Sequence, residues 1–130
     1  MESTDRRTPF SDAELDEFRA LIEGKRRHAL GEVESMRARL KESREAGGDT
    51  AYSLHMADAG SDAAEREQMY QMIGRQQTFA GHLDRALRRS ENKTYGVCRV
   101  TGDPIARERL LAVPHTETSV AAKLDEQKRR

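Results

Sequence analysis

Four positions in the last third of this chain have the spacing of a structural zinc site, but only one of them holds a metal ligand. Two pairs of cysteines, each pair separated by two residues, bind zinc tetrahedrally through four thiolates. Here the four positions hold Cys98, Thr101, Ser119 and Ala122. Because three of the four ligands are missing, we expect the segment to fold without zinc. The Thr101 and Ser119 hydroxyls would then form hydrogen bonds with each other or with the backbone.

Other chemistry for the one cysteine has little support in the sequence. A single thiol cannot form an internal disulfide. A metal site built from Cys98 with His115 or Asp103 would have too few ligands, and no histidine stands where the pattern would place the base of a catalytic thiol. We therefore interpret Cys98 as a small buried residue in a segment held together by packing. The apolar residues expected to pack there are Val97, Val100, Ile105, Leu110, Leu111, Val113, Val120 and Leu124.

A second group of polar residues lies near the middle of the chain, where Asp58 and Asp62 are four positions apart. Two carboxylates held together can share a catalytic Mg²⁺ ion. They would lie on one face of a helix only if that helix includes both, whereas Gly60 and Ser61 predict that it begins between them. The alternative is that the two acids cap the helix.

Two helices with matching apolar stripes must position these groups. The first begins at a capping box formed by Ser11 and Glu14 and ends at about Glu45, before the Gly47-Gly48 pair. The second begins after Ser61 and ends at about residues 90–92. The first stripe consists of Leu15, Phe18, Ile22, Ala29, Val33, Met36 and Leu40. The second consists of Met69, Met72 or Ile73, Gln76, Phe79 or Ala80, Leu83, and Ala86 or Leu87.

These stripes predict a mainly α fold, an antiparallel coiled-coil helical hairpin followed by a small zinc-finger-like module. Each stripe is too narrow to cover a sheet, and pairing the two helices buries both. In the module, one or two short strands are predicted at residues 97–100 and at Ile105. A helical turn is predicted at residues 105–111, and a terminal helix from Ser119 to about Gln127. The predicted segments are a flexible N-terminus (1–10), the hairpin (11–92) with a tip loop at about 46–61, and the module (93–130).

Composition restricts the classes of function. Charged and hydrophobic residues each make up 35% of the 130 residues, which is too little apolar material for a large core. Acidic and basic residues balance at 23 each, so no general DNA-binding surface is indicated. The sequence has neither an apolar run long enough to span a membrane nor a secretory signal, which favours a cytoplasmic protein. A hairpin formed within one chain predicts a monomer.

Two segments, Tyr95–Pro114 and His55–Glu67, resemble the DksA/TraR family of bacterial transcription regulators. The family's tip signature reads D-x-x-D-x-A, and its second aspartate is the one most closely tied to activity. Asp58 falls on that position, forty residues before Cys98 as in the family. Gly60 stands at the alanine position, and His55 replaces the first aspartate.

The resemblance implies a non-enzymatic regulator that inserts its hairpin into the secondary channel of bacterial RNA polymerase. The tip residues His55, Ala57, Asp58, Gly60 and Asp62 would approach the active centre, where Asp58 would alter promoter handling without direct, sequence-specific DNA binding. Some family members also help to form a site for the alarmone ppGpp, the signal of the stringent response. In this chain Lys123, Arg109 and His82 stand in the corresponding region, either as ligands of ppGpp or as solvated surface charges.

Three further interpretations remain open at this stage. A basic cluster formed by Arg85, Arg88 and Arg89 would contact the polymerase or pair with glutamates of the first helix. A Gre-like transcript-cleavage factor would use the same hairpin to place tip carboxylates beside the polymerase Mg²⁺ ion. A structural coiled-coil adapter would have no role in transcription.

Overall fold

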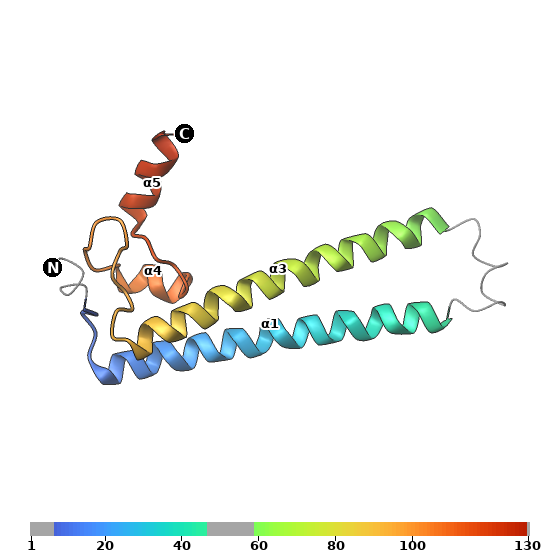
Figure 1. Ribbon diagram of the computed structural model, residues 1–130, viewed down its shortest axis with the longest axis horizontal. Coiled ribbons are helices and arrows are strands. Elements are labelled where there is room, and N and C mark those ends of the chain that lie inside the picture. Colours follow the sequence, from blue (N-terminus) through green and yellow to red (C-terminus); the bar gives the residue numbers. More distant parts are fainter. Residues whose placement is uncertain (1–6, 47–58, 130) are drawn as a thin grey trace. The chain divides into compact units, whose positions relative to one another are not determined.

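The computed structural model describes residues 7–46 and 59–129, which contain four helices (Figure 1). Two long helices, α1 (Asp12–Ala46) and α3 (Ala59–Glu91), are followed by the short helix α4 (Arg107–Ala112) and by α5 (Val120–Arg129). The chain forms two compact units. Residues 27–80 form the hairpin unit, and the residues up to 26 and from 81 onward form the base unit. Within the described ranges, no helix is both long and apolar enough to cross a membrane.

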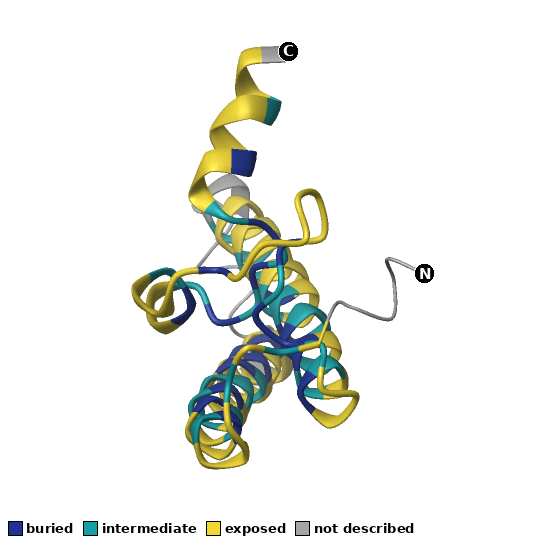
Figure 2. Cartoon of the chain, turned by 90° about the vertical axis from the view of Figure 1, so that its left-hand side faces the viewer, coloured by how far each residue is buried: buried dark blue, intermediate teal, exposed yellow. Residues whose placement is uncertain are grey.

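The hairpin unit is held together by the predicted apolar stripes of α1 and α3. Val33, Met36, Leu40 and Ile73 form its buried cluster, with Met69 packed against them. Each such side chain contributes about 1.5–3 kcal/mol when it is fully buried. Of the alternatives left open for the second stripe, the buried residues are Ile73, Ala80 and Ala86. The seven residues predicted for the first stripe are all buried, which confirms the coiled-coil pattern in both units (Figure 2).

Aromatic packing joins the start of α1 to the segment after α3 in the base unit. The ring of Phe18 lies 5.0 Å from that of Phe10 and 5.3 Å from that of Tyr95, measured between centroids. The Tyr95 hydroxyl donates a hydrogen bond of 2.9 Å to the buried carbonyl of Pro114. Burial raises the pKa of Tyr95 well above its ordinary value, so this hydroxyl remains a donor. An ion pair between Arg26 and Asp84, at 2.5 Å, ties the two long helices together in the same unit.

The helix ends follow their sequence signals with one exception. The predicted capping box at the start of α1 is confirmed by reciprocal hydrogen bonds between Ser11 and Glu14, of 2.9 and 3.2 Å. The prediction that the second helix begins after Ser61 was wrong, because α3 begins at Ala59. The glycine at position 60 is tolerated there because the first N–H groups of any helix lack intrahelical partners, so a first turn depends less on propensity.

The end of α3 is a Schellman motif with lysine in the position usually held by glycine. Lys93 has φ of +63°. The N–H of Thr94 bonds to the carbonyl of Arg89 at 2.9 Å, and that of Lys93 bonds to Ser90 at 3.2 Å. The Lys93 ammonium pairs with Asp12 at the start of α1. The predicted helix end near residues 90–92 is confirmed.

The expected short strands in the module are reduced to one antiparallel bridge, between Val97 and Pro104, within the described residues. Two backbone hydrogen bonds flank this pair, from the N–H of Ile105 to the carbonyl of Gly96 at 2.7 Å and from the N–H of Cys98 to the carbonyl of Asp103 at 2.8 Å, and no further pair of described residues extends the ladder. Instead the N–H of Gly102 bonds to the carbonyl of Cys98 at 2.8 Å, which closes a tight turn. The module is therefore built from turns and two short helices.

Half of the predicted packing residues of the module are exposed. Val100, Leu111, Val120 and Leu124 are each about half accessible to solvent, at 48–52%. In their place the base unit buries Tyr95, Cys98, Pro114 and Ala122 together with the expected Ile105 and Leu110. The position of α4 is held by Arg107, which pairs with Glu14 and Glu17 of α1 at 3.6 and 3.1 Å.

Candidate functional site

Each side chain at a zinc-ligand position has a defined role in the structure. The sulfur of Cys98 accepts a hydrogen bond from the N–H of Ser119 at 3.4 Å. The Thr101 hydroxyl accepts one from the N–H of Asp103 at 3.2 Å. The Ser119 hydroxyl caps α5 by accepting from the N–H of Ala122, also at 3.2 Å. Both hydroxyls therefore bond to the backbone and not to each other, and the Thr101 hydroxyl also bonds to the Cys98 sulfur.

These residues do not fit a four-thiolate zinc site. Such a site needs four sulfur ligands at about 2.3 Å from the metal, and here one sulfur, two engaged hydroxyls and a buried methyl group take their places. The part of the chain that the structure describes holds no cluster of three or more His, Cys, Asp or Glu side chains suited to a metal ion. Hydrogen bonds to Cys98 connect the turn at residues 98–103 to the start of α5, the connection that a metal would otherwise make.

The environment of Cys98 stabilises its thiolate. Burial by itself raises the pKa of this thiol, but hydrogen bonds from the Thr101 hydroxyl and from the N–H groups of Ser119, Thr101 and Val100 outweigh burial and lower the pKa to about 6. The sulfur thus accepts several N–H groups, as a metal-bound thiolate does, without the metal. A pKa of about 6 predicts a thiolate at neutral pH.

The thiolate can be titrated directly because the chain has one cysteine. We expect its ultraviolet absorbance to rise with a midpoint near pH 6 in the folded protein and near the ordinary value of 9.0 after denaturation. Cys98→Ala serves as the blank. A folded-state midpoint at the ordinary value would show that the hydrogen bonds do not stabilise the charge.

A second group of polar side chains in the base unit forms a cationic cluster, defined here as His82, Arg85, Arg89, Arg109 and His115. The rings of His82 and His115 are stacked with centroids 5.5 Å apart. Arg85 lies 2.6 Å from the ring nitrogen of His82, and Arg89 donates to the carbonyl of His115 at 3.2 Å. Arg109 reaches the Thr116 hydroxyl at 3.4 Å. Helices α3 and α4 and the loop between α4 and α5 thus bring these groups together.

The cluster carries an excess of positive charge. Burial lowers the pKa of Arg89, with repulsion from Arg85 acting in the same direction and Glu117, at 3.9 Å, opposing it. Burial also lowers the pKa of His115, and repulsion from His82, Arg89 and Arg109 lowers it further. Glu117 is the one acid that opposes these shifts in both groups. An anion bound here would relieve the repulsion, which makes the cluster a candidate anion site.

Protonation of His115 should destabilise the fold. The pKa of His115 in the folded state lies below the ordinary 6.5, so the folded protein favours the neutral ring. The contribution of the neutral ring to the free energy of unfolding is complete above pH 6.5 and is lost as pH falls through the folded-state pKa. We expect the melting temperature to fall between about pH 7 and 5, and to fall less in His115→Gln. The control is His28→Gln, which removes an exposed histidine of α1. Equal profiles for wild type and His115→Gln would contradict this origin.

The structure brings together two of the three residues predicted to face ppGpp. His82 and Arg109 both belong to the cationic cluster. Lys123 is exposed on α5, and its side chain makes no ion pair or hydrogen bond with a described residue. His115 was missing from the predicted set, and no sequence pattern places it beside α3. Arg89 was expected to contact polymerase or to pair with a glutamate of the first helix, but its carboxylate partner is Glu117.

The predicted tip residues His55, Ala57 and Asp58 lie outside the described residues. Gly60 and Asp62 fall in the first turn of α3, where an acidic side chain is favoured by the helix dipole. Asp62 is half-buried.

Comparison with known proteins supports one family. Residues 93–128 match the prokaryotic dksA/traR C4-type zinc finger. The RNA polymerase-binding transcription factor DksA of Caulobacter vibrioides is 37% identical over 87 residues, which cover 64% of this chain and 61% of the relative. General stress protein 16O of Bacillus subtilis is 40% identical over 73 residues, 55% of this chain and 44% of that protein. The chain thus spans about three fifths of the length of the DksA relative.

The structure of the transcription factor DksA2 from Pseudomonas aeruginosa superposes on this fold with a TM-score of 0.79 and 29% sequence identity, over 90% of this chain and 85% of that protein. The match includes the helical hairpin, so it extends well beyond the finger-like segment. The fold and the sequence identities agree, and both make this chain similar to proteins of the DksA/TraR family.

Proposed function

We propose that this protein is a transcription regulator that binds bacterial RNA polymerase and catalyses no reaction of its own. The observation that carries the proposal is the likeness to DksA2 over 90% of this chain. The relative from Caulobacter vibrioides is named for polymerase binding, and its similarity to this chain supports the same partner. The balanced charge is consistent with a protein partner, because binding along a nucleic-acid backbone needs a broad surplus of cations.

In this proposal the hairpin enters the secondary channel, and the tip, with His55, Ala57, Gly60 and Asp62 around Asp58, modulates initiation near the active centre. The module stabilises the base unit by packing and hydrogen bonds, with no zinc or other cofactor. We further propose that the protein acts as a cytoplasmic monomer. The segment boundaries at about residues 10 and 92 stay predictions.

Transcription in vitro with the cognate polymerase tests the function. Wild-type protein is expected to change the yield from sensitive promoters, and Asp58→Asn is expected to reduce that effect at least about tenfold, since a hydrogen bond to a charged group contributes about 1.5–3 kcal/mol. Glu32→Gln is the matched control, because it removes an exposed acid of α1 outside the tip, and it should retain most of the effect. Equal activity of Asp58→Asn and wild type would contradict the role of the tip, and metal-dependent shortening of RNA in backtracked polymerase would indicate a cleavage factor instead.

The cationic cluster is our proposed site for ppGpp in the complex with polymerase. His82 and Arg109 lie in the cluster, and the excess positive charge around His115 favours a polyphosphate. Lys123 would have to approach from α5. The test adds ppGpp to the same assay with wild type and with Arg109→Ala. Arg109→Ala should lose the response to ppGpp and keep the effect that the tip has without ppGpp.

A further inference from the structure

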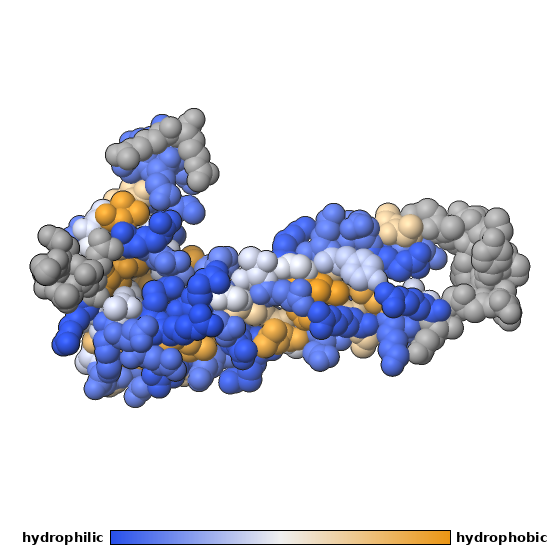
Figure 3. Space-filling model, viewed as in Figure 1, coloured by the Kyte–Doolittle hydropathy of each residue, from blue (hydrophilic) through white to orange (hydrophobic). Residues whose placement is uncertain are grey.

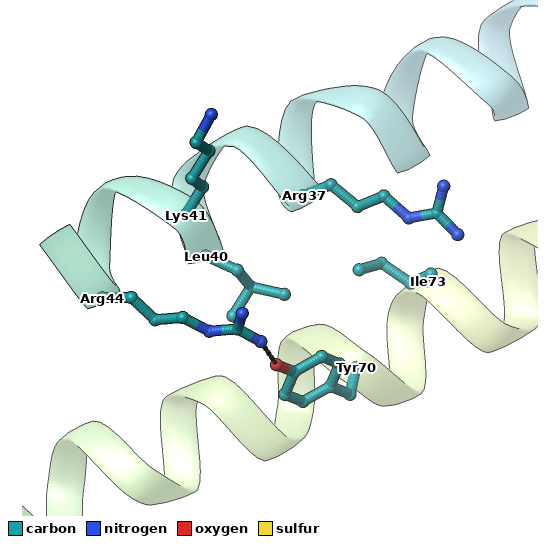
Figure 4. A pocket seen from close by; sticks show the side chains of 6 residues that line it. All are labelled: Arg37, Leu40, Lys41, Arg44, Tyr70 and Ile73. Carbon is teal, nitrogen blue, oxygen red and sulfur yellow. Dashed lines mark hydrogen bonds between the residues drawn. The ribbon is translucent and has the colours of Figure 1, made fainter.

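A groove in the hairpin unit has the chemistry of a binding site. It has a volume of about 500 Å³, within the range of about 300–1,000 Å³ that is usual for ligand sites. Both long helices contribute to it (Figure 4). Its lining residues are Arg37, Leu40, Lys41 and Arg44 of α1, and Tyr70 and Ile73 of α3.

Three cations line one side of the groove because their spacing of four and three residues places them on one face of α1. Arg44 donates a hydrogen bond of 2.8 Å to the Tyr70 hydroxyl, which holds both side chains in place. Arg37 and Lys41 are exposed, and neither has an ion-pair partner among the described residues. Their charges are therefore available to carboxylates from another molecule.

The floor of the groove is apolar. Leu40 and Ile73 belong to the buried cluster of the hairpin unit, and their edges face the opening. Tyr70 forms a wall and is 45% exposed, which is unusual for so large a side chain. In the space-filling view, apolar side chains along this seam of α1 and α3 are flanked by strongly hydrophilic ones (Figure 3). Tyrosine and arginine are also the residue types that contribute most to protein interfaces.

We propose that this groove binds an acidic segment of a protein partner. Carboxylates of the segment would bind Arg37, Lys41 and Arg44, and one apolar side chain would pack between Tyr70 and the floor. Nucleic acid is a poorer occupant because acidic side chains are interspersed with the cations of these helices. Exposed acids lie on the same two helices, including Glu34, Glu42 and Glu67, and would repel an extended phosphate backbone.

The probe is a short fluorescein-labelled peptide with acidic residues on both sides of a central leucine. It is added to the full chain at low salt. Fluorescence anisotropy measures its affinity. Arg37→Glu combined with Lys41→Glu is expected to weaken binding at least about tenfold, as reversal of charges that contact a partner does. Arg39→Glu combined with Arg75→Glu is the matched control, because both residues are exposed and lie outside the lining. The two double variants change the net charge by the same amount. This control should stay within about twofold of wild type.

Replacing the central leucine of the peptide by serine should also weaken binding if the apolar floor is used. The proposal is overturned if the peptide fails to bind wild type, if both double variants lose the same affinity, or if an oligothymidylate of equal charge binds the groove more tightly. Circular dichroism confirms that the variants fold, and Tyr70→Ser gives a second test without charge reversal. The test does not involve RNA polymerase, so failure of the proposed function would leave its outcome unaffected.

Discussion

Gly96→Ala is expected to lower the free energy of unfolding by about 2–5 kcal/mol, the largest effect of a single small substitution in the base unit. Gly96 has φ of +85°, where an added Cβ costs about 1–2 kcal/mol. That Cβ would lie 2.5 Å from Cε2 and 3.0 Å from Cδ2 of Phe10, so the ring must move. Its movement would disturb the packing of Phe10 on Phe18. Urea unfolding followed by circular dichroism measures the change.

Gly102→Ala provides the matched control because it shares the backbone cost without the collision. Gly102 has φ of +79°, and no atom lies within 4 Å of the position its Cβ would take. We expect this variant to lose about 1–2 kcal/mol. The difference between the two variants measures the packing of Phe10 against the segment after α3. Equal losses would show that Phe10 moves aside at no cost.

Restoring the missing ligands should make the module depend on zinc. Combining Thr101→Cys, Ser119→Cys and Ala122→Cys places four thiols at the spacing of the family's zinc finger. Without metal the variant should be less stable than wild type, since loss of the Ser119 cap costs about 1 kcal/mol. With zinc its melting temperature should rise strongly, because structural zinc supplies about 10–16 kcal/mol of apparent binding energy in small fingers. Thermal unfolding with and without zinc, together with elemental analysis, measures both effects.

Wild type should show no change of melting temperature with either zinc or a chelator, since hydrogen bonds already occupy the ligand positions. The matched variant uses Ala121→Cys in place of Ala122→Cys, which keeps three new thiols but breaks the spacing. It should gain little from zinc. Stoichiometric zinc in purified wild type, with a lower melting temperature after chelation, would show that the module is a metal site after all.

The sequence alone was sufficient to predict the hairpin and most of its details. Helix periodicity depends on local spacing, so the stripe from Leu15 to Leu40 identified the buried face of α1 correctly. The Ser11 capping box involves residues within one turn and was equally accessible to sequence analysis. The residue types at Cys98, Thr101, Ser119 and Ala122 exclude a four-thiolate site, and the expectation that the segment folds without zinc stays a prediction. The sequence left the partners of the hydroxyls open, and the structure shows backbone N–H groups for both and the Cys98 sulfur as a further partner of Thr101.

Only the tertiary structure decided what lies inside the base unit and which cations meet. Val100 and Leu124 are as apolar as Ile105, but the small module has room for few side chains, and Tyr95 takes much of it. His115 meets His82 because the loop between α4 and α5 folds back on α3, a contact between residues far apart in the chain. The groove at Tyr70 likewise needs two helices, one from each side of the hairpin. Local patterns specify helices, whereas a buried position or a charge cluster depends on which distant segments come together.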